Sequence, residues 1–221
     1  MHDRVTTAPG ANRLPRAAAG GLFLFLVLCL GAAVPATPAS AQENEAVGQV
    51  TRQQGVVTAL RATAARPLRL GASVFRGDQV ITAAAAKVEI AFEDGSTLSV
   101  GPDTSVELES YSAAPRQGGL QLLIGIIRTS LSNLWTGGFE VRTRAAVASA
   151  RSTEWITEAD EGHSAVFVVS GEVEVTGTAT GTAVRLSAGD GTDVDLGEPP
   201  SPPVQWGDAR VQDVLTRTRL P

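Results

Sequence analysis

Apolar and polar positions alternate in short runs along most of the chain, beginning at Val47. The clearest run is residues 87–92, in which charged and apolar side chains take turns. This alternation predicts a strand with one buried face. Turn residues recur up to Leu196 at roughly eight- to twelve-residue spacing, without a helical period between the runs. We therefore predict an all-β fold, a single domain of many short strands arranged as a sandwich or a β-solenoid-like stack.

Glycines mark where these strands turn. The Asp94-Gly95 pair after the run 87–92 predicts a hairpin. Gly77-Asp78 predicts a turn before the apolar segment 79–82. Gly125 lies inside an apolar run rather than between runs, so we expect a bulge or a sharp bend there.

The two ends of the chain differ from the strand-rich part. Residues 198–204 are rich in proline and predict an extended linker after a domain spanning residues 42–197. Residues 205–221 predict a short C-terminal helix or tail, capped by Asp208. Its apolar side is predicted to carry Val211, Val214 and Leu215. We expect this helix to pack on the sheet, the alternative being that it docks on a partner.

Residues 1–41 have the pattern of a cleavable secretory signal peptide. Three arginines precede an apolar run at 21–30, and Ala39-Ser40-Ala41 is a suitable cleavage site before Gln42. The run is shorter than the ~20 residues of a spanning helix. We predict export to the periplasm or beyond and no membrane span after cleavage, with retention as an anchor as the alternative.

Composition then narrows the function. The sole cysteine, Cys29, leaves with the signal, so the mature chain has no disulfide, thiol nucleophile or thiolate ligand. Cleavage removes three Arg and one Asp, which takes the net charge from −5 to about −7. An acidic domain is a poor binder of nucleic acid. Lys87, the lone lysine, suggests no function of its own.

Catalytic chemistry is sparse. We expect His163 to be a solvated turn residue, and zinc sites need three or four clustered ligands. No Gly-x-Ser-x-Gly elbow accompanies it. The pairs Glu107/Glu109 and Glu172/Glu174 each share one strand face, which predicts a solvated surface with Leu108 and Val173 pointing inward. We expect no enzyme activity, no catalytic residue, no metal site and no cofactor.

Two further features leave binding open. Residues 190–195 look like a calcium loop but lack the EF-hand order, so we expect a turn and an edge strand whose aspartates face water. Trp155 lies in a strand among apolar neighbours and is expected in the core. Trp135 and Trp206 keep open an alternative function, an envelope glycan-binding module without catalytic activity.

Five segments in order resemble the FecR domain family. They are similar to the family's Gly-Asp opening, its Asp-Gly-Ser strand, its Arg-Gly-Thr signature and its closing strands, and they cover about residues 47–196. The segments are Gly71–Thr82, Val88–Leu98, Val141–Thr157, Ser170–Val175 and Leu186–Gly189.

The resemblance singles out positions without assigning them chemistry. The candidate family-motif positions are Gly77, Asp78, Thr82, Asp94, Gly95, Arg151, Thr153, Trp155 and Gly171. This chain departs from the family pattern at Arg144, Ser152 and Trp155. Ser152 replaces a glycine, which indicates that the position need not hold a positive φ.

The best-known members of the family are inner-membrane regulators that relay a siderophore signal to a sigma factor. Those proteins have an anti-sigma segment, a transmembrane helix and a further periplasmic region, none of which we expect here. The iron-regulation role is therefore not expected to carry over. The resemblance implies a non-enzymatic periplasmic module that senses or scaffolds through contacts with an envelope protein, bound at a free sheet edge.

Overall fold

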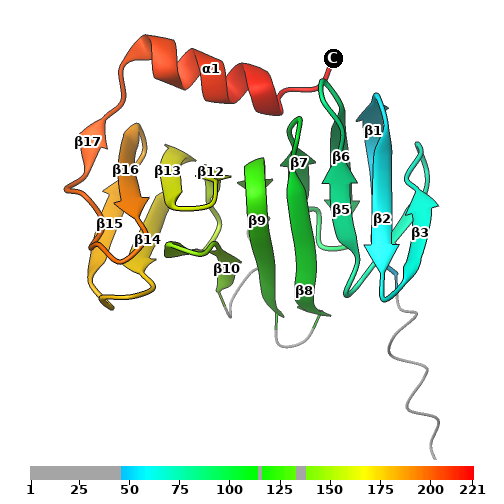
Figure 1. Ribbon diagram of the computed structural model, residues 1–221, viewed down its shortest axis with the longest axis horizontal. Helices are drawn as coiled ribbons and strands as arrows, with labels where there is room; N and C mark the ends of the chain where they lie inside the picture. Colours follow the sequence, from blue (N-terminus) through cyan, green and yellow to red (C-terminus); the bar gives the residue numbers. More distant parts are fainter. Residues whose placement is uncertain (1–45, 114–115, 133–137) are drawn as a thin grey trace, which may run out of the picture. The chain divides into compact units, whose positions relative to one another are not determined.

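The computed structural model describes residues 46–113, 116–132 and 138–221 (Figure 1). The predicted signal peptide and Trp135 lie outside these residues. The N-terminal half contributes β1 (Ala46–Gln54), β2 (Val57–Arg61), β3 (Ala64–Pro67), β4 (Ser73–Phe75), β5 (Gln79–Thr82), β6 (Lys87–Phe92), β7 (Thr97–Val100), β8 (Ser105–Ala113) and β9 (Arg116–Ser130).

The C-terminal half continues the series and ends in a helix. Its elements are β10 (Phe139–Arg142), β11 (Ala146–Ala150), β12 (Glu154–Ala159), β13 (His163–Ser170), β14 (Glu172–Gly177), β15 (Ala183–Ser187), β16 (Asp190–Asp195), β17 (Val204–Gln205) and α1 (Asp208–Thr218). The predicted all-β class with a short C-terminal helix is confirmed. Among the described residues, no helix has the length and apolar character needed to span a membrane.

The strands form two layers that share β9. Layer A has the order β4-β1-β6-β7-β9-β12-β13-β16-β17. Layer B has the order β3-β2-β5-β8-β9-β10-β11-β14-β15. Neighbouring strands are antiparallel except for β9 and β10. The chain thus advances from one end of both layers to the other, with β9 at the centre of each.

Gly125 is where β9 passes from layer B to layer A. Up to Ile124 the strand pairs with β8, and from Gly125 onward it pairs with β12. The backbone of Gly125 has φ +102°, and a Cβ there would lie 2.2 Å from Thr104 Oγ1. Only glycine fits such a position. The bend predicted from the sequence is confirmed, and it connects the two layers.

One hydrophobic core fills the space between the layers, which makes the fold a sandwich. Layer A contributes side chains such as Ile90 and Trp155, and layer B contributes Leu122, Phe139 and Val173. Alternate residues point into this core in strands such as β6, β11 and β14. The stepwise advance of the chain gives the sandwich a solenoid-like order, so each of the two predicted architectures describes one aspect of the fold.

Helix α1 covers part of the outer face of layer A. Buried Val214 packs in a second apolar cluster with Ile126, Ile156 and Phe167, separate from the main core. Figure 1 shows α1 running along the row of strands from β17 toward β6. The expectation that the helix packs on the sheet is therefore confirmed.

The predicted cap of this helix is wrong. The N-cap residue is Gly207, which has no side chain to bond the free N–H groups, and Asp208 lies in the first turn. An acidic group in that turn still interacts favourably with the helix dipole. At the other end the Lys87 ammonium donates to the carbonyls of Thr216, at 2.6 Å, and Arg219, at 2.9 Å. The lone lysine therefore satisfies carbonyls at the C-terminal end of α1.

We predict that Val214→Asp releases α1 while the sandwich stays folded, because the cluster under the helix is separate from the main core. Burying a carboxylate at this site should cost about 2–3 kcal/mol, or on the order of 100-fold in amide protection. Hydrogen exchange should show the loss in residues 208–218 and unchanged protection in β9 and β12. Gln212→Asp, on the exposed side, is the control. Loss of protection throughout the strands would contradict the prediction.

Candidate functional site

The family-motif positions Gly77 and Asp78 close one end of the sandwich. Gly77 turns the chain with φ +78°. The Asp78 carboxylate is fully buried, accepts a hydrogen bond from the backbone N–H of Phe75 at 2.9 Å, and forms ion pairs with Arg61 and Arg66. Arg61 and Arg66 belong to β2 and β3 of layer B, whereas Phe75 belongs to β4 of layer A. Asp78 therefore ties the two layers together at this end.

Thr82, Asp94 and Gly95 fix turns. The Thr82 hydroxyl donates to the carbonyl of Gly101 at 2.6 Å and accepts from the N–H of Thr104 at 3.0 Å. Asp94 accepts from the N–H two residues further on at 3.0 Å, and Gly95 has φ +84°. The predicted Asp-Gly hairpin between β6 and β7 is thus present.

The signature residues Arg151, Thr153 and Gly171 come together at one corner. The Thr153 hydroxyl hydrogen is shared between the carbonyls of Arg151, at 2.7 Å, and Glu172, at 3.0 Å. Gly171 has φ +86°, and a Cβ there would lie 2.8 Å from Thr153 Oγ1. The threonine thus fastens the β13–β14 turn to the β11–β12 turn, while the Arg151 side chain is exposed.

The interpretation of Ser152 is wrong. Its φ is +49°, so the position does hold the left-handed conformation that glycine adopts freely. Serine therefore occupies a left-handed backbone position that glycine would adopt without strain.

We predict that Ser152→Gly stabilises the domain. The left-handed backbone costs an L-residue roughly 1–2 kcal/mol, and glycine loses roughly 0.5–1 kcal/mol of backbone entropy, which leaves a net gain of about 0.5–1 kcal/mol. Gly171→Ala should shift stability in the opposite direction, because its Cβ meets Thr153. Urea unfolding of the three proteins measures both effects, and a loss of stability in Ser152→Gly would refute the strain at this position.

The described tryptophans are buried. Trp155 is fully buried and packs edge-on against Phe139, with ring centroids 6.3 Å apart, which confirms its predicted place in the core. Trp206 lies under α1, stacked on Phe167 at 5.1 Å, and Arg210 covers its other side at 3.4 Å. Neither ring is available to a sugar, so the glycan-binding alternative loses these two residues.

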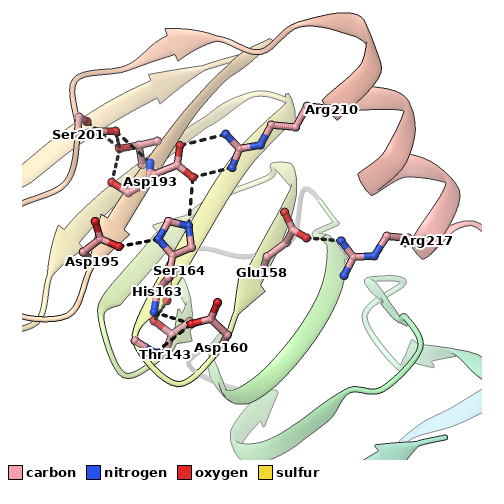
Figure 2. A network of polar contacts seen from close by, with 12 residues as sticks. Thr143, Glu158, Asp160, His163, Ser164, Asp193, Asp195, Ser201, Arg210 and Arg217 are labelled. Atoms are coloured by element: carbon pink, nitrogen blue, oxygen red, sulfur yellow. Dashed lines mark hydrogen bonds and ion pairs between the residues drawn. The ribbon is translucent and has the colours of Figure 1, made fainter. Parts of the chain in front are cut away.

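His163 lies at the centre of a polar network, so the expectation of a solvated turn residue is wrong. It is the partly buried first residue of β13, next to Asp193 and Asp195 of β16 (Figure 2). Its Nδ1 lies 2.8 Å from an Asp195 oxygen, and its Nε2 lies 3.3 Å from an Asp193 oxygen. The Asp160 carboxylate accepts from the His163 backbone N–H at 2.7 Å.

This network extends to α1. The Asp193 carboxylate accepts hydrogen bonds from both terminal nitrogens of Arg210, one of them at 3.0 Å. Glu158, on β12, pairs with Arg217. Figure 2 shows both arginines reaching from α1 to the strands. His163, Asp193 and the two arginines therefore hold the helix on the strands. His163, Arg210 and Arg217 also line a cleft of about 420 Å³.

The charged groups of this network shift one another's pKa values. Partial burial disfavours the charged histidine most, yet Asp195, Asp193 and Asp160 together outweigh it and raise the pKa of His163 above its ordinary value of 6.5. The hydrogen bonds from Arg210 lower the pKa of Asp193 despite its partial burial. Folding therefore favours the protonated form of His163 relative to the unfolded chain.

The sequence predicts that the aspartates of residues 190–195 face water, and this prediction is wrong for Asp193. Asp195 is exposed, but Asp193 is engaged by His163 and Arg210. The backbone of Asp193 also pairs with Ser201 of the proline-rich segment, at 2.9 and 3.0 Å. This segment and β17 therefore cover the open side of β16.

We predict that His163 stabilises the domain more in acid than in base. Because its pKa is raised on folding, its contribution is fully present below the unfolded pKa and is lost as the pH rises through the folded pKa. The melting temperature of the wild type should exceed that of His163→Gln by more at about pH 5.5 than at about pH 8.5. An equal difference at both pH values would show that the proton on His163 does not matter.

β15 is the lateral edge that the described chain leaves open. The Gly177 N–H donates to the Thr182 carbonyl, so these two residues form a hydrogen-bonded pair. Hydrogen-bonded and non-hydrogen-bonded pairs alternate along an antiparallel ladder, and this pair fixes which residues of β15 bond to β14. Ala183, Arg185 and Ser187 therefore direct their backbone groups away from β14. Asp190 accepts the N–H of Ser187 at 3.0 Å. Among the described strands none pairs with β15 on its outer side.

A cleft of about 600 Å³ adjoins this edge on the outer face of layer B. It is lined by the arginines Arg151 and Arg185 and by the glutamates Glu140, Glu172 and Glu174. The pair Glu172/Glu174 flanks buried Val173, as predicted for a solvated face. The pair Glu107/Glu109 likewise flanks buried Leu108.

Comparisons with known proteins agree with this fold. The family model for FecR protein matches residues 78–174. Two crystal structures, at 1.65 and 2.50 Å resolution, of a candidate anti-sigma factor from Parabacteroides distasonis ATCC 8503 each align with a TM-score of 0.53, at 17% and 16% identity. The alignments cover 62% of this chain and 64% and 63% of the other chains, so this chain spans less than two thirds of those proteins. No curated protein is similar to the sequence.

Proposed function

Since this chain carries a FecR domain, we propose that it is an exported, non-enzymatic module of the bacterial envelope that senses or scaffolds through protein–protein contacts. The FecR family is regulatory, and the similar fold of a candidate anti-sigma factor supports a role in signalling. The signal-peptide pattern of residues 1–41 supports a periplasmic location.

The observation that carries this proposal is the open edge of β15. Three of the lateral edges formed by the described strands are protected: β3 contains Pro67, β4 has three residues, and β16 is covered by β17 and Ser201. β15 instead presents the outward backbone groups of Ala183 and Arg185, beside the Ser187 N–H, which donates to Asp190. A partner strand could extend layer B there by β-augmentation, in which backbone hydrogen bonds provide the affinity.

Other functions receive less support from the described residues. The titratable groups around His163 hold one another and the helix. No three His, Cys, Asp or Glu side chains in the described ranges are placed to bind a metal ion. Burial of Trp155 and Trp206 takes two of the three tryptophans away from the glycan-binding alternative, and the third, Trp135, lies outside the described residues.

The proposal predicts that Arg185→Pro abolishes partner capture. Proline removes the outward N–H of residue 185, and β15 loses no bond to β14 because that N–H points away from β14. The full chain with a C-terminal tag, expressed in its host, should be recovered from the periplasm without residues 1–41 and with a specific protein. The Arg185→Pro chain should lose that protein by tenfold or more.

Arg185→Thr is the matched control, because it removes the same side chain but keeps the N–H and strand propensity. It should retain the partner, and both variants should melt near the wild-type temperature. A partner captured equally well by Arg185→Pro would rule out this edge, and recovery from the cytoplasm with residues 1–41 intact would rule out export.

A further inference from the structure

The side chains beside the open edge show what a partner strand would meet. Across the outer face of layer B, register places Glu140, Ser149, Glu174 and Arg185 in one row that runs from β10 to β15. Arg185 ends the row. Its side chain is 68% exposed, and its one described ion pair, with Glu174, is long at 3.5 Å.

A strand added to β15 would place one residue directly opposite Arg185. Directly opposed side chains lie roughly 4.5–5.5 Å apart at Cβ, where opposite charges attract and like charges repel. Because Arg185 is exposed and only weakly paired, its charge is available to that residue. An acidic side chain fits this position and a basic one does not.

The inner face of layer B determines which residues can flank the acidic residue of the partner strand. Two apolar rows cross layer B toward the edge and end in Val184 and Leu186. Leu186 is fully buried, whereas Val184 is half-buried at the end of its row. Residues flanking the acidic position would point to this inner side, and an apolar side chain opposite Val184 would cover its exposed part.

β14 already pairs with β15 in this way. Its segment Val173-Glu174-Val175 faces Val184-Arg185-Leu186, with glutamate opposite arginine and valines on the buried side. We propose that the partner of this module presents a strand with an acidic residue between two apolar residues, placed opposite Arg185 on the free side of β15. This inference rests on the proposed function and specifies the chemistry of its partner.

The test uses cyclic β-hairpin peptides, since cyclisation lowers the ordering cost of a short strand. One edge of each peptide carries Val-Glu-Val, Val-Lys-Val or Thr-Glu-Thr, and titration calorimetry measures Kd with the full mature chain. The wild type should bind Val-Glu-Val about fivefold or more tighter than Val-Lys-Val, and Thr-Glu-Thr should also bind more weakly. Arg185→Glu should reverse the preference between glutamate and lysine.

Arg69→Glu makes the same charge change at an exposed position between β3 and β4, the outermost strands at the other end of the layers, and should leave the preference unchanged. Equal binding of the glutamate and lysine peptides, lost in Arg185→Pro, would overturn the acidic requirement while strand addition stands. A glutamate preference that survives both Arg185→Glu and Arg185→Pro would place binding elsewhere and overturn the inference. Binding of none of the peptides would overturn it as well, and the capture experiment would then decide separately whether β15 is a binding edge.

Discussion

The passage of β9 between the layers at Gly125 is the constraint on which the rest of the structure depends. A single strand at the centre of both sheets joins β8 and β10 in one layer to β7 and β12 in the other. The crossing requires φ +102° and a close approach to Thr104, so no side chain fits at this residue. With the crossing fixed, both halves of the chain build outward from a common centre over one core, and the lateral edges fall at opposite ends.

The motif residues of the family act on that architecture rather than on a ligand. Asp78 joins the layers at one end, Thr82 and Asp94 fix turns, and Thr153 fastens two turns around Gly171. Each is engaged by backbone groups or by a charge from the other layer. These motif residues therefore specify the fold, and the proposed binding edge lies apart from them on β15.

The sequence predicted what depends on local pattern. Strand alternation, the Asp94-Gly95 hairpin, the bend at Gly125 and the burial of Trp155 follow from neighbours in the chain or from side-chain type. The environment of His163 could not be predicted, because it comes from the pairing of β13 with β16. The sequence of one strand alone does not determine its register with another strand. Lys87 was missed for the same reason, since its partners lie more than a hundred residues further along. The conformation of Ser152 was predicted wrongly because residue type is weak evidence when the surrounding turn dictates φ.

The open side of β15 is best understood against the way the other edges are treated. A bare edge strand is a liability, since it can pair with any exposed strand, and native proteins shield such edges. This domain uses proline in β3, extreme shortness in β4, and the proline-rich segment over β16, while Arg210 and Arg217 hold the following helix in place. The means to cover β15 therefore exist close by, because the proline-rich segment passes next to Gly177 at the end of β14. An edge left free beside so much protection, and bearing a single exposed charge that makes pairing selective, is the arrangement expected of a binding surface rather than of an unfinished sheet.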